Sequence, residues 1–412
     1  MAVRHGYGKI AGADALVFAY DTGDTRNSYK GEPTVNYVPG TYAYSLYAYA
    51  SGPVNTTVLN ENNKSITAKR YTITNTVNTA RAAIFPTGLT TGVAYTFSFK
   101  WKYNGTTTTS PSIGVSAYKG NPETNNNGFS SETQDTVSIG NGWYLTTYTF
   151  VFSSNPTGAC MLTFGINTGS NTSYLGETFD IYEAQFEIKD HRTPFVNGTR
   201  SATQGLLDLT GNTSIDLTNA GFNSNAEIDL DGTSGYLETP ISSLFNLNAK
   251  NFSIETVFYG DPSLDSANKY TGIVTLIDAA NSDRMFIGGL RSALTGLAGL
   301  YTVNDGIAGF ITDAYSGYTY GSYDYTYPGK YTHLVYMTDY TNTTQRLYIN
   351  GELYATKSSN TFTNTDCRIR IGRNEVNEYL NGKVDVVKFY NRALTADEVR
   401  NNYRHYKTRF NI

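Results

Sequence analysis

The sequence has few charged residues and no long apolar run. Lys and Arg number 31 and Asp and Glu number 35 in 412 residues, so charged residues make up 16% against a usual ~25%. The basic residues are scattered singly and the net charge is −4, which excludes the concentrated positive surface of a nucleic-acid-binding protein. No segment approaches the ~18 consecutive apolar residues of a membrane span, and the first residues lack the apolar core of a signal peptide. We therefore expect a protein made in a cytoplasm that binds no nucleic acid and does not insert into membranes.

Cysteine, proline and methionine are also scarce. Cys160 and Cys367, the only two cysteines, lie far apart, so we expect buried free thiols and no disulfide. Eleven Pro without a glycine period of three exclude collagen, and four Met without long Ala, Glu, Lys and Leu stretches disfavour helical bundles. Tyrosine is abundant, with 35 residues, and aromatic residues reach 14%. This composition favours an all-β protein.

Alternation of apolar and polar residues, interrupted by tight-turn dipeptides, is the dominant local pattern. Asn-Gly pairs include those that begin at residues 104, 141, 197, 350 and 381, and Asp-Gly pairs begin at residues 231 and 305. The clearest hairpin spans residues 347–355, where Asn350 and Gly351 supply the two positive φ angles of a type I′ turn. The pattern predicts antiparallel sandwich domains.

Strand spacing predicts two tandem jelly-roll or β-sandwich domains after a short N-terminal segment. Residues 1–53 hold one apolar strand and a tyrosine-rich stretch, too little to fold alone, and we expect them to anchor or oligomerise the protein. Residues 54–190 contain at least six strands and read as one jelly roll, with Trp101 and Trp143 as core residues. A linker over 191–204 leads to a larger sandwich over 205–412.

One short helix is predicted at the end of the last domain. Thr395 is its expected N-cap, and Glu398 three residues later completes a capping box. Val399, Tyr403 and Tyr406 then recur on one helical face. We expect this helix to pack on the sandwich.

Six segments in the last part of the chain share their order with a known family. They are residues 227–239, 252–258, 331–336, 347–352, 371–373 and 381–395. Together they resemble the concanavalin A-like lectin/glucanase superfamily in its laminin-G-like branch. The chain departs from the family at Phe258 and Tyr331, where the family often has Trp. The resemblance implies a lectin-like sandwich.

Other segments resemble parts of bacteriophage proteins. Residues 95–99, 142–144, 148–150 and 179–187 are similar to jelly rolls of the carbohydrate-binding-module type. The junction over 185–200 and the opening over 16–33 resemble tail-fibre and other virion appendage proteins. The resemblance implies a virion protein of a tail fibre, collar or head decoration, with other virion proteins bound through residues 1–53. We expect a homotrimer.

Three carboxylates follow each other at alternate positions, at Glu227, Asp229 and Asp231. A retaining glycosidase needs two carboxyl groups ~5 to 5.5 Å apart, one with a raised pKa, in an aromatic-lined cleft. The following Asp231-Gly232 turn signal favours instead an exposed strand face that ends in a turn. In the resembling superfamily a structural calcium ion often joins the first and last strands, and the matching positions here are Asp231 and Asp385. Their oxygens are of the kind that Ca²⁺ prefers.

The four histidines do not form a recognisable catalytic pattern. His5, His191, His333 and His405 lack zinc or triad spacing, and the chain has no nucleophile elbow and no phosphate loop. We expect His333 to be a packed residue of its strand. These observations predict that the protein is not an enzyme.

Six tyrosines fall close together among Gly, Ser and Thr. They are Tyr315, Tyr318, Tyr320, Tyr323, Tyr325 and Tyr327. Tyrosine combines rigid aromatic area with a hydroxyl group, which suits glycan binding as well as protein contact. We take these residues as the candidate glycan-binding site, while packing on the domain itself or on a neighbouring subunit stays open.

The combined prediction is a non-enzymatic virion protein that presents a lectin-like domain to cell-surface glycans. Two alternatives remain at this point. One is a purely structural module that binds proteins and no sugar, and the other is a glycoside hydrolase. The fold cannot separate the three, because sandwiches of this kind support all of these functions.

Overall fold

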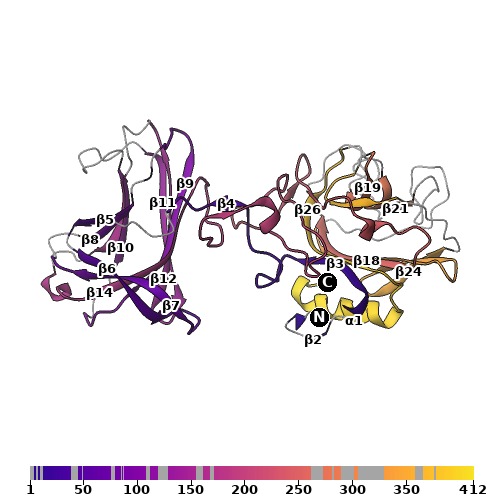
Figure 1. Ribbon diagram of the computed structural model, residues 1–412, viewed down its shortest axis with the longest axis horizontal. Coiled ribbons are helices and arrows are strands. Elements are labelled where there is room, and N and C mark those ends of the chain that lie inside the picture. The colour runs from indigo at the N-terminus through magenta and orange to yellow at the C-terminus, as the bar shows by residue number, and fades with distance from the viewer. Residues whose placement is uncertain are drawn as a thin grey trace. The chain divides into compact units, whose positions relative to one another are not determined.

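The computed structural model divides the chain into two compact units (Figure 1). It describes residues 4–5, 8–9, 13–38, 45–48, 50–75, 79–84, 86, 88–107, 112–118, 129–154, 161–167, 171–260, 272–280, 283–288, 301–304, 329–357, 365–374 and 377–412. One unit, here called the lectin-like unit, consists of Met1–Pro33, Ser201–Asn223 and Glu227–Ile412. The other, the inserted unit, consists of Thr34–Arg200 and Ser224–Ala226. The described elements are almost all antiparallel strands, which confirms the predicted all-β class.

The lectin-like unit contains a seven-stranded and a five-stranded sheet. The first follows the order β16 (Leu230–Asp231), β26 (Asn381–Tyr390), β18 (Phe252–Gly260), β22 (Tyr331–Asp339), β23 (Thr344–Ile349) and β24 (Glu352–Lys357), and β3 (Leu16–Asp21) also pairs with β26. The second follows β17 (Leu237–Glu238), β25 (Cys367–Ile371), β19 (Gly272–Asp278), β20 (Asp283–Gly288) and β21 (Tyr301–Asn304). β1 (Arg4–His5) and β2 (Gly8–Lys9) form a separate pair.

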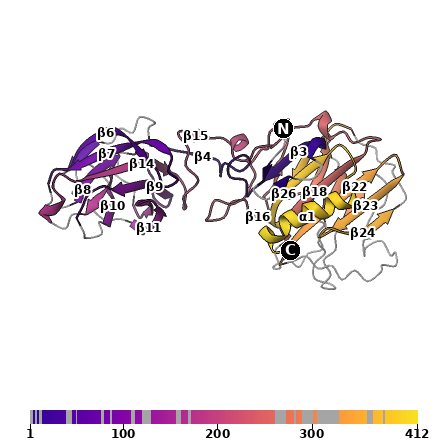
Figure 2. The same ribbon diagram turned by 90° about the horizontal axis from the view of Figure 1, so that it is seen from below.

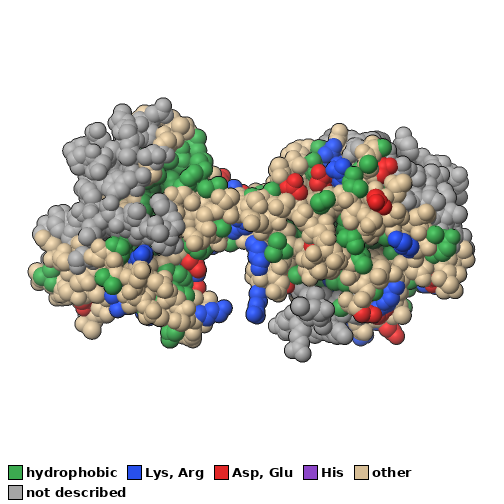
Figure 3. All heavy atoms as spheres, in the orientation of Figure 1, with side chains coloured by type: hydrophobic (Ala, Val, Ile, Leu, Met, Phe, Trp, Pro, Cys, Tyr) green, Lys and Arg blue, Asp and Glu red, His purple; other side chains and the backbone are tan. Residues whose placement is uncertain are grey.

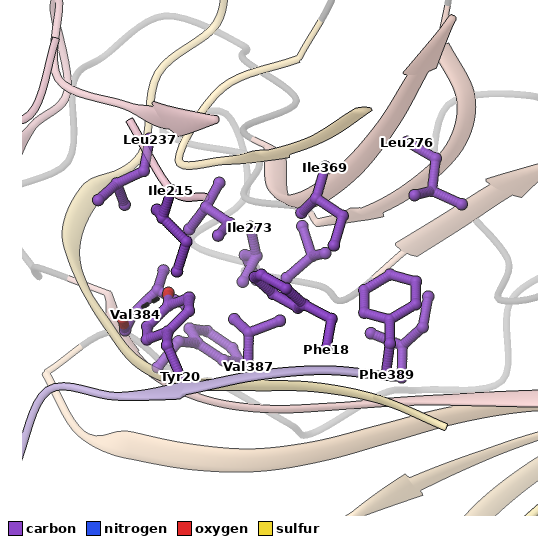
Figure 4. Close-up of a cluster of buried hydrophobic side chains, with 14 of the residues drawn as sticks. Phe18, Tyr20, Ile215, Leu237, Ile273, Leu276, Ile369, Val384, Val387 and Phe389 are labelled. Carbon is purple, nitrogen blue, oxygen red and sulfur yellow. Dashed lines mark hydrogen bonds between the residues drawn. The ribbon is translucent and has the colours of Figure 1, made fainter. Parts of the chain in front are cut away.

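The N-terminal strand β3 completes the core of this unit. Phe18 and Tyr20 are fully buried and lie beside Val387 and Phe389 of β26, as Figure 4 shows. The Tyr20 hydroxyl donates a hydrogen bond to the Val384 carbonyl over 2.9 Å. The strand is therefore an integral part of the sandwich.

The inserted unit is a second sandwich of antiparallel sheets. Its four-stranded sheet follows β10 (Ser112–Tyr118), β13 (Met161–Asn167), β8 (Thr79–Ile84) and β5 (Ser45–Ala48). Its six-stranded sheet follows β11 (Phe129–Gly140), β12 (Trp143–Phe152), β9 (Ala94–Tyr103), β14 (Thr178–Glu187), β7 (Ser65–Ile73) and β6 (Ala50–Leu59). Trp101 and Trp143 are both buried, which confirms their prediction as core residues.

The chain enters and leaves the inserted unit through paired segments. β4 (Thr34–Val35) pairs with β15 (Thr199–Arg200) at the two ends of this unit. The buried Glu187 carboxylate accepts hydrogen bonds from the Thr34 hydroxyl (2.7 Å) and the Thr193 amide (3.1 Å). These bonds hold the entering and leaving segments together.

The predicted C-terminal helix is confirmed as α1 (Ala396–Phe410). Thr395 and Glu398 form the capping box, and Leu394 packs with the buried Val399. Figure 2 shows α1 lying across the sheet of β26, β18 and β22. Short 3-10 helices complete the described elements: η1 (Ala13–Ala15), η2 (Thr172–Tyr174), η3 (Ala202–Gln204) and η4 (Ser243–Phe245).

The predicted Asn-Gly hairpin is confirmed between β23 and β24. Asn350 has φ 48° and Gly351 has φ 81°, as a type I′ turn requires. The Asn350 side chain accepts a hydrogen bond from the His333 amide over 3.0 Å. The hairpin is thereby fixed to β22.

The structure differs from the expected boundaries at the N-terminus. Residues 1–53 are not a segment apart: Leu16–Asp21 is a strand of the lectin-like unit, and Ala50–Leu59 is a strand of the inserted unit. The sequence missed this because β3 and its partner β26 lie at opposite ends of the chain. Local patterns predict strands but not such distant pairing.

Two smaller predictions concern cysteine and charge. Cys367 is a buried free thiol, as expected, while Cys160 lies outside the described residues. On the face shown in Figure 3, Lys and Arg side chains are scattered and form no continuous patch. Among the described residues, no helix has the length and apolar character to cross a membrane.

Candidate functional site

The six candidate glycan-binding tyrosines lie outside the described residues. Tyr315, Tyr318, Tyr320, Tyr323, Tyr325 and Tyr327 all fall within 305–328, which the structure does not describe. Their role in glycan binding stays a prediction.

Asp231 caps a turn at the end of β16. Its carboxylate accepts hydrogen bonds from the backbone amides of Thr233, Ser234 and Gly235 at 2.8 to 2.9 Å. The hydroxyl groups of Thr233 and Ser234 donate to the same carboxylate. Partial burial raises the pKa of Asp231, but these hydrogen bonds outweigh it and hold the pKa well below its usual range. Asp231 therefore stabilises the turn over residues 231–235 that precedes Tyr236.

Asp385 fastens the end of β3 to the sheet. Its carboxylate accepts hydrogen bonds from the Thr22 hydroxyl and, over 2.8 Å, from the Tyr331 hydroxyl. The Thr22 amide also donates to the Asp385 carbonyl over 2.9 Å. Tyr331 thus uses a hydroxyl at a position where the family often has Trp.

The structure does not bring the two expected calcium ligands together. Asp231 pairs with Asn381 in the register of β16 and β26, four residues before Asp385 on the same strand. Four residues of strand span ~13 Å, too far for one ion whose ligands lie at ~2.4 Å. The described residues contain no group of three His, Cys, Asp or Glu arranged to hold a metal. The register thus places Asp231 and Asp385 apart on the paired strands, and calcium binding at these residues stays a prediction.

The carboxylates before Asp231 lack the features of a glycosidase pair. Glu227 is exposed, accepts a hydrogen bond from Asn223 and pairs with Lys383 over 3.0 Å. The Asn223 hydrogen bond and then Lys383 lower the pKa of Glu227, whereas a general acid needs a raised pKa. Asp229 is half-buried beside them. The arrangement suits a surface turn, as the sequence favoured.

A buried polar cluster beneath α1 was not anticipated. Glu255 of β18 lies at its centre and is fully buried. Its carboxylate accepts hydrogen bonds from His333 Nε2 (2.8 Å), Asn402 Nδ2 (3.1 Å) and the Tyr390 hydroxyl, and Lys388 Nζ lies 3.5 Å away. His333 is thus packed, as expected, and lies in this cluster.

Electrostatics keep Glu255 ionised in this cluster. Burial alone would raise its pKa, but the charge of Lys388 and the hydrogen bond from His333 outweigh it and lower the pKa to about 2. Burial also lowers the pKa of Lys388, against the opposing effect of Glu255. None of the cluster's sheet residues reaches solvent, so the cluster fastens α1 to the sheet and cannot meet a substrate.

The surface of the lectin-like unit carries a cluster that we call the tyrosine–arginine surface. It consists of Asn219, Tyr236, Arg373, Asn377 and Tyr379. The Arg373 guanidinium carbon lies 4.8 Å from the centre of the Tyr236 ring and 5.4 Å from that of Tyr379. The two rings are 6.3 Å apart and inclined at 48°. A cation within ~6 Å of an aromatic face is held there electrostatically.

Turns on two chain segments present these side chains. Tyr236 follows the turn capped by Asp231, and its amide donates to the Asn219 carbonyl over 3.0 Å. Gly372 has φ 86°, a conformation that glycine adopts most readily, and a Cβ there would lie 2.6 Å from Leu230 Cδ1, so glycine is favoured where the chain turns toward Arg373. Arg373 then bridges to Tyr379 across a short hairpin.

The polar groups around the rings are amides and guanidinium groups. The Asn219 side chain donates to the Tyr236 hydroxyl over 2.9 Å, and the Arg373 guanidinium donates to the exposed Asn377. Half-buried aromatic faces beside such hydrogen-bonding groups can hold a sugar ring and its hydroxyl groups. Sequence reasoning noted the segments of Tyr236 and Arg373 only for their family resemblance, since no local pattern shows that they meet.

Comparison with known families identifies the domain. Residues 231–400 match the family described as the concanavalin A-like lectin/glucanases superfamily. The chain therefore carries a concanavalin A-like lectin/glucanase domain. Its lectin-like unit has the carbohydrate-binding type of fold that the resemblance implied. No curated protein matches the chain at a significant level.

Solved structures include similar folds at low identity. Domain 4 of an extracellular arabinanase from Geobacillus stearothermophilus, in complex with arabinotriose, is 18% identical, with TM-score 0.34, covering 49% of this chain and 93% of that one. The binding domain of botulinum neurotoxin serotype G is 16% identical, with TM-score 0.34, covering 50% and 49%. Trypanosoma rangeli sialidase is 14% identical, with TM-score 0.35, covering 48% and 30%. The chain thus spans half or less of the last two proteins, and similarity at this level supports no conclusion about ligand or activity.

Proposed function

We propose that this chain is a non-enzymatic structural protein of a bacteriophage virion whose lectin-like unit adheres to cell-surface glycans. One observation carries the glycan-binding part: a lectin/glucanase domain bears two tyrosine rings that flank an arginine at its surface. Aromatic faces with adjacent amide groups are the chemistry by which proteins hold sugars.

The virion setting rests on the sequence resemblance of the segments over 16–33 and 185–200 to phage appendage proteins. A tail fibre, a collar and a head decoration all fit this proposal. Copies of the chain would assemble as a homotrimer, so that several weak sugar sites act together on one particle. Because Leu16–Asp21 is a strand of the lectin-like unit, contacts with other virion proteins through residues 1–53 would use exposed side chains such as Val35 and Tyr37.

The absence of enzymatic activity is part of the proposal. Support comes from Glu227 and Asp231, the carboxylates whose pKa values are lowered where a glycosidase needs one raised. Incubation of the chain with the glycans that it binds should release no reducing sugar. Release that disappears in Glu227→Gln would establish the hydrolase alternative instead.

A glycan array probed with the full-length chain tests the adhesion role. The full chain is needed, because a fragment over 205–412 would lack β3 and its buried side chains. We expect binding to a restricted set of glycans. A blank array would contradict the proposal and favour the purely structural alternative.

Mass spectrometry of purified phage particles tests the virion role. We expect peptides of this chain in stoichiometric amounts with other particle proteins. Their absence from particles that otherwise contain a complete set of structural proteins would contradict this part of the proposal.

A further inference from the structure

We propose that the tyrosine–arginine surface binds a sugar that carries a carboxylate group. This inference rests on the proposed glycan-binding function and adds its site and the chemical class of its ligand. The observation behind it is the state of Arg373, which differs from that of its neighbours Arg368 and Arg370.

Arg373 has no carboxylate partner among the residues that the structure describes. Arg368 and Arg370 both pair with Glu238, at 3.4 Å and 3.0 Å. The Glu378 carboxylate, from the residue before Tyr379, accepts a hydrogen bond from the Asn374 side chain over 2.7 Å. Within the described part of the surface, Arg373 therefore keeps a positive charge that no carboxylate neutralises.

The guanidinium group of Arg373 is held in place but not saturated with hydrogen bonds. The rings of Tyr236 and Tyr379 fix its plane, and Asn377 accepts one of its hydrogen bonds. Its Nε–H group is buried and has no acceptor in the described structure. Buried donors without a partner are rare in proteins, because each costs free energy until an acceptor is supplied.

A carboxylate supplies the negative charge that Arg373 lacks, at the end of the guanidinium group, since the buried Nε–H is out of a ligand's reach. Its two oxygens match the fork of guanidinium N–H groups, and such pairs are stronger than neutral hydrogen bonds. With the carboxylate on Arg373, the sugar ring would lie against a tyrosine face, within reach of the exposed amides of Asn219 and Asn377. A neutral sugar would gain the aromatic contact but leave the charge of Arg373 unmatched.

Matched pairs of glycans and variants test this proposal in the full-length chain. The probes are sialyllactose against lactose, and galacturonic acid trimer against its methyl ester. The variants are Arg373→Gln, which removes the charge, and Tyr236→Ala, which removes one ring. Arg400→Gln is the control, because Arg400 is an exposed arginine on α1, paired with Asp397. Far-ultraviolet circular dichroism of α1 verifies that each variant is folded.

We expect the wild-type chain to bind the acidic member of a pair at least about tenfold more tightly than the neutral member. This preference should weaken as salt is added. Arg373→Gln should abolish the preference, Tyr236→Ala should weaken binding of both members, and Arg400→Gln should leave binding unchanged.

The outcomes separate this inference from the proposed function. Equal binding of acidic and neutral members by the wild-type chain would overturn the ligand class while glycan binding stands. A preference for acidic glycans that persists in Arg373→Gln would overturn the site. Binding of no glycan by the wild-type chain would overturn both proposals.

Discussion

Asp231 and Asp385 show what polar side chains at strand ends contribute to this fold. The sequence could predict that Asp231-Gly232 forms a turn, because a carboxylate readily accepts hydrogen bonds from the backbone amides that follow it. It could not predict that the Asp385 carboxylate accepts hydrogen bonds from the hydroxyl groups of Thr22 and Tyr331, since these residues are distant from Asp385 in the sequence. The sequence therefore predicts hydrogen bonds between residues that are close along the chain. It does not predict hydrogen bonds to residues that only the fold brings close.

The buried Glu255 gives a prediction for acid stability. Its folded pKa of about 2 lies below the value of ~4.3 of an unfolded glutamate. The unfolded chain therefore takes up a proton first as pH falls, so the stabilisation is complete above the unfolded pKa and is lost between about pH 4.3 and 2. For this fully buried group the loss amounts to roughly 3 kcal/mol. Helical circular dichroism during urea unfolding measures it, because α1, the α-helix of the described residues, belongs to the lectin-like unit.

Two variants control for other acidic groups. Glu255→Gln should be less stable at neutral pH, because Lys388 then loses its buried counter-charge, and should show a flatter stability profile below pH 4.3. Glu352→Gln alters an exposed side chain and should retain the wild-type profile. A wild-type profile in Glu255→Gln would show that Glu255 does not contribute to the acid response.

At the scale of elements, local signals predicted the hairpin and the helix but not the pairing of β3. The capping box of Thr395 and the Asn-Gly turn involve residues within a few positions of each other. Pairing of Leu16–Asp21 with β26 joins the two ends of the chain, and an apolar strand carries no signal for such a partner. For the same reason the tyrosine–arginine surface could not be predicted, as its rings belong to segments that only the fold brings together.

The hairpin allows a matched test of its turn. Gly351 has φ 81°, and a Cβ there would lie 2.7 Å from Tyr403 Cδ1 of α1. Gly211 has a similar φ of 75°, but a Cβ there would meet nothing within 4 Å. Both alanine variants pay the cost of a positive φ at a non-glycine residue. Because only Gly351→Ala also clashes with α1, we expect it to be less stable than Gly211→Ala by ~1 to 3 kcal/mol. Urea unfolding followed by helical circular dichroism measures the difference, and equal stabilities would show that α1 shifts without cost.

At the scale of the whole molecule, the two units differ in how the chain builds them. Residues before and after the inserted unit form one sandwich, because β3 pairs with β26 and Tyr29 pairs with Leu206. Strand spacing had suggested tandem domains, since it detects strands without showing to which sheet they belong. Most strands of the inserted unit fall within the jelly roll expected over 54–190, but β5 (Ser45–Ala48) and the start of β6 (Ala50–Leu59) come before it.

This architecture predicts that the inserted unit can be removed. Thr34 and Arg200 are paired in β4 and β15, so their backbones lie ~5 Å apart and a short glycine-containing turn can join Pro33 to Ser201. We expect the shortened chain to unfold cooperatively with intact α1 and unchanged glycan binding. Tryptophan fluorescence should vanish, because Trp101 and Trp143 are the only tryptophans and both lie in the inserted unit.

Deletion of residues 1–33 provides the contrasting variant. It leaves the inserted unit whole but removes Phe18 and Tyr20 from the core of the lectin-like unit, together with the Asp21 carboxylate that binds Arg409 of α1 at 2.7 and 2.8 Å. Truncation of one fully buried aromatic side chain lowers the free energy of unfolding by ~3 to 5 kcal/mol, and this deletion removes two of them. We therefore expect this variant to lose its helical signal and glycan binding, while its tryptophan fluorescence still reports a folded inserted unit. If instead both deletions leave α1 intact and glycans bound, β3 is an accessory strand and the lectin-like unit is complete without the N-terminal segment.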